Sequence, residues 1–338
     1  MQRLSAILLT LCCLALAATG CSSEPPGEAH PVNPRGKPMT LTFNGGPRGG
    51  TFNQFANKMA ALISEDVPNL DVLARQSAGS VSNLLALCAG EADMAIVNAG
   101  DAFLGRTGKL RCVDKKYVEI QALAFLYGSP AQLVVRADSN IHTGLDLRGK
   151  VIAVGNPGSG AALSAERFFR HLELWTRFEH RPVGYAEAAA DFAAGEVDGF
   201  WILAGAPTAA VIEAAAAVPV RILNLHETAT ASGFYRLYPF YSHATIPAGT
   251  YPGQTEPVST FQDAALWCAR PGLDNRTVYD SLQAVFSARR MEELRRMHTA
   301  AGSLSLQTGI DNLSIPLHPG AVHFWSEHQL KIPAILMP

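Results

Sequence analysis

The sequence predicts an α/β protein built from two doubly wound lobes with a ligand cleft between them. Three observations predict this fold class. The chain has 338 residues, of which 48% are hydrophobic and 17% are charged, a globular composition long enough for about two domains. Short apolar runs alternate with glycine-rich loops and helical patterns, which is typical of parallel sheets. A short motif from the first half also recurs at a matching place in the second half.

The first half contains three expected strands separated by two expected helices. The strands are predicted over residues 39–43, 70–74 and 94–97. The apolar residues between them recur at helical spacing, first at Phe55, Met59, Leu62 and Ile63, then at Val81, Leu84, Leu85 and Cys88. This order of strand, loop and helix is the repeating unit of a parallel sheet.

The second half repeats the pattern. Strands are expected over residues 133–136 and 150–154, the second one followed by a glycine-rich loop over 155–160 and a helix over 161–172. The motif Gly-Glu-Val-Asp at 195–198 echoes Gly-Glu-Ala-Asp at 90–93. Two similar halves predict two lobes that face each other across a cleft.

Three loops between a strand and a helix are candidates for binding a ligand in that cleft. They are residues 49–51, 77–80 and 158–160, each with glycine and at least one hydroxyl side chain. In open α/β sheets, ligands bind beyond the carboxyl ends of the strands, where backbone N–H groups and helix N-termini attract anions. A small carboxylate suits such loops. The alternative is that Thr51 and Ser80 only cap their helices and the glycines only allow the turns.

Residues 1–20 read as a lipoprotein signal peptide, with Arg3 ahead of an apolar run. The stretch before Cys21 resembles a bacterial lipobox, so Cys21 is the expected lipidation site and the mature protein is expected in the periplasm, anchored to a membrane. Ordinary cleavage that leaves Cys21 as a spare thiol is the alternative. Residues 21–38 are rich in proline and predict a flexible tether. An exported chain permits a disulfide, and Cys88 with Cys112 is the closest pair in sequence, although both thiols staying free remains open.

The remaining composition argues against several function classes. A net charge of −2 offers no basic surface for nucleic acid. No nucleotide-binding, hydrolase or zinc motif is present, and the histidine spacing does not predict a metal site. The charged run at 289–296 predicts a solvated helix face with i,i+3 and i,i+4 ion pairs. We therefore expect no cofactor, no metal and no catalytic residues, and an exported enzyme is the weaker hypothesis.

Five stretches in order along the chain resemble the TAXI group of extracytoplasmic solute receptors, which serve TRAP transporters. They are residues 45–51, 80–84 with 90–93, 154–160, 195–198 with 204–208, and 318–325. The resemblance implies a type II periplasmic-binding-protein fold, with lobe I from residues 39–130 and 240–338 and lobe II from residues 131–239. It also implies a small carboxylate or amino acid ligand, such as a dicarboxylate or glutamate, and TRAP transporter membrane subunits as partners.

The resemblance and the loops together give a set of candidate ligand-binding residues. They are Gly49, Gly50, Thr51, Phe52, Ser80, Asn98, Ser159, Gly160, Ala161, Gly205 and Ala206. We expect the ligand to bridge backbone donors of the two lobes and so to favour a closed state. For Phe52, a place in the cavity wall and a place in the core are equally open.

The chain departs from the family pattern where a ligand would be recognised. The family usually has Gln-Ser-Asp after the third strand, and this chain has Asn-Ala-Gly at 98–100, so an ammonium group loses its acidic partner unless Asp101 substitutes. Arg48 or Arg75 could pair a carboxylate, or could simply be surface residues. A sensory receptor of the same fold with a membrane signalling partner is the alternative function.

Overall fold

The computed structural model describes residues 38–110 and 119–338. Its ten strands form one mixed sheet. They are β1 (Met39–Asn44), β2 (Leu70–Arg75), β3 (Met94–Asn98), β4 (Gln121–Arg136), β5 (Val151–Ala153), β6 (Glu179–Arg181), β7 (Gly199–Leu203), β8 (Val220–Ile222), β9 (Ser242–Ile246) and β10 (Val258–Ala269).

Eleven α-helices accompany these strands in the described ranges, together with four short 3-10 helices. The α-helices are α1 (Thr51–Asp66), α2 (Ser80–Ala89), α3 (Ala99–Thr107), α4 (Gly160–His171), α5 (Tyr185–Ala194), α6 (Ala209–Ala217), α7 (His226–Ala231), α8 (Phe234–Leu237), α9 (Asn275–Val285), α10 (Ala288–Met297) and α11 (Pro319–Glu327). The 3-10 helices are η1 (Gly144–Leu147), η2 (Trp175–Arg177), η3 (Thr299–Ser303) and η4 (Ala334–Leu336). None of these helices is long and apolar enough to span a membrane.

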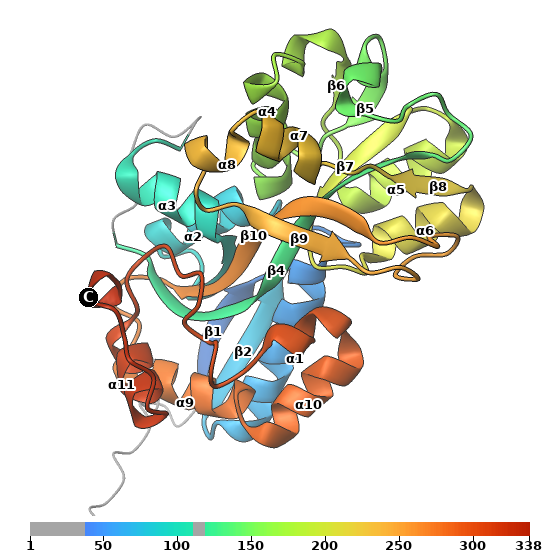
Figure 1. Ribbon diagram of the computed structural model, residues 1–338. Coiled ribbons are helices and arrows are strands. Elements are labelled where there is room, and N and C mark those ends of the chain that lie inside the picture. The colour runs from blue at the N-terminus through green and yellow to red at the C-terminus, as the bar shows by residue number, and fades with distance from the viewer. Residues whose placement is uncertain (1–37, 111–118) are drawn as a thin grey trace, which may run out of the picture.

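Two long antiparallel strands join the two lobes. The sheet order is β2-β1-β3-β10-β4-β7-β5-β6, with β8 on β4 and β9 on β10. The groups β2-β1-β3 and β7-β5-β6 are parallel, whereas β4 and β10 pair in antiparallel fashion. Figure 1 shows β4 and β10 running through the middle of the molecule, between one group of elements around α4–α7 and another around α1, α9 and α10. The predicted α/β fold with two lobes is confirmed.

Each lobe has its own hydrophobic core. The first core takes apolar side chains from residues 41–127 and 264–336, with Trp267 and Trp325 fully buried. The second takes them from residues 131–261, including Trp201 and Phe168. The predicted domain boundaries at 131 and 240 stay predictions. The second core also takes side chains from residues 241–261, which the prediction assigned to lobe I.

The predicted elements agree with the structure where the pattern is local. The strands expected at 39–43, 70–74 and 94–97 are β1, β2 and β3, and the three helices expected after the glycine-rich loops are α1, α2 and α4. The strand expected at 133–136 is only the end of β4, which begins at Gln121. The strand continues through Gly128 and Pro130, which pair with Ala264 and Gln262 on β10.

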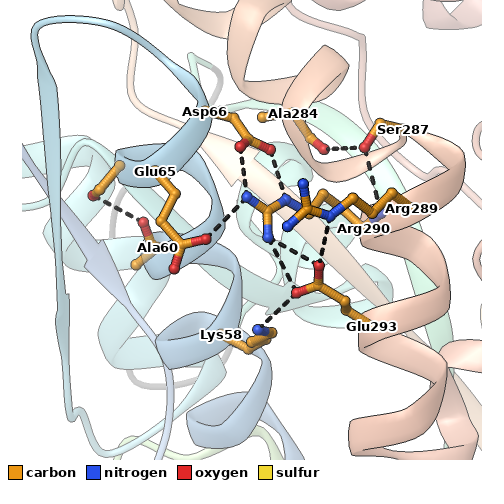
Figure 2. Close-up of polar contacts among 10 residues, drawn as sticks. Lys58, Ala60, Glu65, Asp66, Ala284, Ser287, Arg289, Arg290 and Glu293 are labelled. Carbon is orange, nitrogen blue, oxygen red and sulfur yellow. Dashed lines mark hydrogen bonds and ion pairs between the residues drawn. The ribbon is translucent and has the colours of Figure 1, made fainter.

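Contrary to the sequence prediction, the charged run on α10 is not fully solvated, because one of its arginines is buried. The expected i,i+4 pairs are present, since Arg289 lies 3.3 Å from Glu293 and Arg296 lies 3.1 Å from Glu292. Arg290, however, is buried, and its guanidinium donates to Asp66 on α1 at 2.7 and 2.5 Å. Figure 2 shows this arginine between the two helices, where it also contacts Glu65 and Glu293. The cluster therefore ties α10 to α1.

Several sequence predictions lie outside the described residues. They are the signal peptide, the Cys21 lipidation site, the tether up to residue 37, and Cys112. Cys88 is half-buried on α2, and its pairing with Cys112 stays a prediction.

Candidate functional site

A small cavity lies between the two lobes, at the loops that precede helices α1, α2 and α4. Its lining residues come from both lobes: Pro47, Gly50, Thr51, Phe52, Ala78, Gly79, Ser80 and Asn98 on one side, and Ser159, Gly160, Ala161, Tyr185, Leu203 and Ala204 on the other. The lobes meet so closely that the cavity volume is about 20 Å³, room for about one water molecule. A larger ligand therefore requires the lobes to move apart.

Local backbone geometry brings these loops to the cavity. Gly79, the residue before α2, has a φ of +123°. Residues that carry a Cβ rarely adopt this backbone conformation. Gly160, the first residue of α4, lies so close to lobe I that a Cβ there would stand 2.2 Å from Asn98 Nδ2. Glycine at these two positions lets the main chains of the two lobes approach each other.

Three helix N-termini converge on the cavity. Helices α1 and α2 begin after glycines, Gly50 and Gly79, and neither has a side-chain cap. Helix α4 is capped by Ser159, whose Oγ accepts from the amide N–H of Ala162 at 3.0 Å. The first-turn N–H groups of a helix have no partner within the helix, and its dipole favours negative charge there. The cavity is therefore suited to a small anion, although its wall contains no lysine or arginine.

The polar side chains in the wall differ in which hydrogen-bonding groups they have free for a ligand. Ser80 Oγ accepts from the Asn98 amide at 2.9 Å, so its own hydroxyl hydrogen remains available for another acceptor. Thr51 Oγ1 donates to the Gly205 carbonyl at 2.7 Å, which uses that hydroxyl in a contact between lobes. Asn98 is buried, and its Oδ1 has no hydrogen-bond partner within the described structure.

Direct contacts around the cavity hold the lobes together. The Ser82 amide donates to the Gly158 carbonyl at 3.0 Å, and Asn156 Nδ2 donates to the Ala78 carbonyl at 3.2 Å. On another side, His298 Nδ1 accepts from the Ala300 amide at 3.0 Å. This leaves Nε2 as the N–H that donates to the Pro207 carbonyl at 2.9 Å. These bonds join the lobes in a closed arrangement.

A buried ion pair lies behind Asn98 and Gly160. Arg167 on α4 donates to Asp101 Oδ1 on α3 at 2.7 Å and to the Tyr241 hydroxyl at 3.1 Å. Nearby, Asp263 accepts from the amides of Gly100 and Ala264. Burial, and then the charge of Asp101, raises the pKa of the Asp263 carboxyl to about 8. At neutral pH the Asp263 carboxyl is therefore mostly protonated.

The predicted site residues fall into two groups in the structure. The cavity wall includes Gly50, Thr51, Phe52, Ser80, Asn98, Ser159, Gly160 and Ala161, and it does not include Gly49, Gly205 and Ala206. Gly205 instead accepts the Thr51 hydroxyl. Arg48 and Arg75 are exposed and do not line the cavity. Whether the lining residues bind a ligand stays a prediction.

Sequence reasoning missed the wall that lobe II contributes through Tyr185, Leu203 and Ala204. Tyr185 places its ring edge against Gly50, and its hydroxyl bonds the Leu203 backbone at both O and N, at 3.0 and 3.2 Å. The signal available was Gly184 ahead of the α5 pattern, the same glycine-to-helix junction as in the other loops.

The family model of the NMT1-like family matches residues 43–328. The chain belongs to this family. Two solved structures share its fold. BugD, a periplasmic binding protein, is 13% identical with a TM-score of 0.52, over 87% of this chain and 93% of that one. MatC from Rhodopseudomonas palustris, solved with bound malate, is 16% identical with a TM-score of 0.51, over 78% of this chain and 88% of that one. At these identities the likeness is one of fold, that of periplasmic solute-binding proteins.

Proposed function

We propose that this NMT1-like protein is an extracytoplasmic solute receptor that binds a small organic carboxylate between its lobes. The observation that carries the proposal is the convergence of the α1, α2 and α4 N-termini on one interlobe cavity. These helices come from both lobes, so an anion held among them contacts lobe I and lobe II together. The two-lobed fold and the malate-bound MatC neighbour are in keeping with it.

Lobe closure is the proposed mechanism. The anion first meets the amides at the starts of α1 and α2 in lobe I. The loop before α4 then closes over it and brings Ser82 toward Gly158 and Thr51 toward Gly205, with the lobes further apart than in the arrangement described, whose cavity holds about one water molecule. Because the ligand contacts both loops only when the lobes are together, it stabilises the closed state.

A TRAP-type transporter of the TAXI group is the proposed membrane partner, and the closed surface of both lobes is what it would recognise. The support is the set of TAXI-like stretches in the sequence, at 45–51, 80–84 with 90–93, 154–160, 195–198 with 204–208, and 318–325. The first four of them contribute residues to the cavity wall. The proposed location is the periplasm, with the chain anchored through a lipid on Cys21.

Native mass spectrometry of the freshly purified mature protein tests the proposal. A co-purified organic acid of small mass should leave the protein on unfolding and should rebind to the refolded, ligand-free protein in calorimetry. Absence of binding for short carboxylates at millimolar concentration would contradict the receptor role. Conversion of the bound acid during incubation would indicate an enzyme instead.

A further inference from the structure

We infer that the ligand is a short monocarboxylate whose remaining part is uncharged and largely apolar. This inference rests on the proposed receptor function and deepens it by choosing among carboxylate classes. It comes from the chemistry of the cavity wall, taken residue by residue.

The described cavity wall contains no carboxylate, lysine, arginine or histidine side chain. Its polar side chains are the hydroxyls of Thr51, Ser80 and Ser159, the Asn98 carboxamide and the Tyr185 phenol. The three helix N-termini can bind one carboxylate. A second carboxylate, or an ammonium group, would be buried with no opposite charge in the wall, which is unfavourable for binding.

The nearest charged side chains are already occupied with each other. Arg167 is buried, and its two terminal nitrogens bond Asp101 and Tyr241 at 2.7 and 3.1 Å. Neither Arg167 nor Asp101 lines the cavity. The second oxygen of Asp101 has no hydrogen-bond partner and lies beside Gly160. An amino acid must therefore be compared directly with its deaminated analogue in the experiment.

The rest of the wall is apolar. Phe52, Ala161, Leu203 and Ala204 present carbon to the cavity, and the Tyr185 hydroxyl is already satisfied by the Leu203 backbone. Such a wall suits a hydrocarbon body, and a short one requires the smallest separation of the lobes, since the closed cavity holds only about one water molecule. The unpartnered, buried Oδ1 of Asn98 is an independent sign of a ligand, because buried polar atoms are nearly always hydrogen-bonded. Since this oxygen can only accept, the uncharged ligand group that would satisfy it is a hydroxyl on the otherwise apolar body.

Calorimetry on the refolded, ligand-free protein tests the inference with acetate, propionate, butyrate, succinate and 2-aminobutyrate. Each methylene from acetate to butyrate should raise the affinity about fourfold. Butyrate should bind about 100-fold more tightly than succinate, which adds a carboxylate, and than 2-aminobutyrate, which adds an ammonium group. Binding to the cavity should disappear in Ser159→Asp and persist in Gly302→Ala, which lies outside the cavity and where a Cβ meets no atom within 4 Å.

The possible outcomes distinguish a failure of the monocarboxylate inference from a failure of the proposed receptor function. If succinate or 2-aminobutyrate binds as tightly as butyrate or more tightly, the monocarboxylate inference is wrong and the receptor function stands. Butyrate binding unaffected by Ser159→Asp would also overturn it, because the site would lie elsewhere. If none of the five acids binds at millimolar concentration, the carboxylate receptor itself is wrong.

Discussion

Ser159 is the residue before helix α4, and it lines the cavity from lobe II, facing lobe I. Its Oγ caps the helix through the Ala162 amide, and its side chain is almost fully buried against the cavity. A change at this position therefore alters the charge of the site with little effect on the helix, provided that the new side chain also caps.

The substitution Ser159→Asp should abolish anion binding while the protein stays folded. Aspartate caps a helix as well as serine does, but its carboxylate would repel the bound anion across a short distance. We expect a loss of affinity of at least about 100-fold in calorimetry, with an unchanged circular dichroism spectrum. Ser159→Asn is the control, because it caps without a charge. Equal affinity in both variants would remove the α4 loop from the site.

Asp263 gives the stability of the protein a pH dependence of its own. Its pKa is raised to about 8 in the folded protein, chiefly by burial. A carboxyl with a raised pKa favours folding below its unfolded pKa of about 3.9, and this contribution is lost as the pH rises toward 8. We expect the free energy of unfolding of wild type to fall between pH 5 and pH 8, by at most about 1.4 kcal/mol per pH unit, relative to Asp263→Asn.

Chemical denaturation of both proteins at pH 5, 6, 7 and 8 measures this difference. Asparagine keeps the shape of the side chain and cannot titrate, so the two curves should diverge as the pH rises. Parallel curves would show that Asp263 ionises at an ordinary pKa.

At the scale of elements, the tie between α1 and α10 depends on one buried arginine. Arg290 and Arg289 are neighbours on α10, yet the Arg290 side chain is 6% exposed and the Arg289 side chain is 78% exposed. Both contact Glu293, but only Arg290 reaches Asp66 and Glu65 on α1. The Arg290 guanidinium, through its hydrogen bonds to Asp66, also lowers the pKa of that carboxyl.

Arg290→Ala should therefore destabilise the protein much more than Arg289→Ala. Loss of the Arg290 bonds leaves Asp66 without its cation and opens space between the helices, with an expected loss of about 1–3 kcal/mol. The exposed Arg289 pair should contribute within about 0.5 kcal/mol. Urea denaturation measures both, and equal effects would mean that burial adds nothing to the tie.

For the whole molecule, the decisive feature is the close approach of the lobes at Gly160. A Cβ at this position would stand 2.6 Å from Asp101 Oδ2 and 2.9 Å from Ser80 Cβ, both in the opposite lobe. Neither atom can move far, since Asp101 is held by Arg167 and Ser80 by the Asn98 amide. A methyl group there would act as a wedge between the lobes.

We expect Gly160→Ala to shift the protein toward an open state and to weaken ligand binding at least about tenfold, because ligand binding requires closure. Small-angle scattering should give a larger radius of gyration in the presence of ligand than for wild type. Gly302→Ala is the control, since a Cβ at 302 meets no atom within 4 Å. Unchanged affinity in Gly160→Ala would show that the lobes do not close at this point.

Patterns within a few residues of one another were sufficient to predict much of this protein. The strands at 39–43, 70–74 and 94–97 and the helices after the glycine-rich loops follow from alternation, helical spacing and Gly-to-helix junctions. They also placed Gly50, Ser80 and Gly160 at one edge of a sheet, because the carboxyl ends of parallel strands share an edge.

Contacts between distant residues decided the rest. Arg167 pairs with Asp101 across 66 residues, and Arg290 pairs with Asp66 across 224. Neither pair has a local signature, so Arg290 looked like a surface residue. The extent of β4 through Gly128 and Pro130 likewise depends on its partner β10. Secondary structure and the loop chemistry come from neighbours along the chain, whereas burial, charge pairing and the wall of the cavity come from packing, which only the folded chain sets.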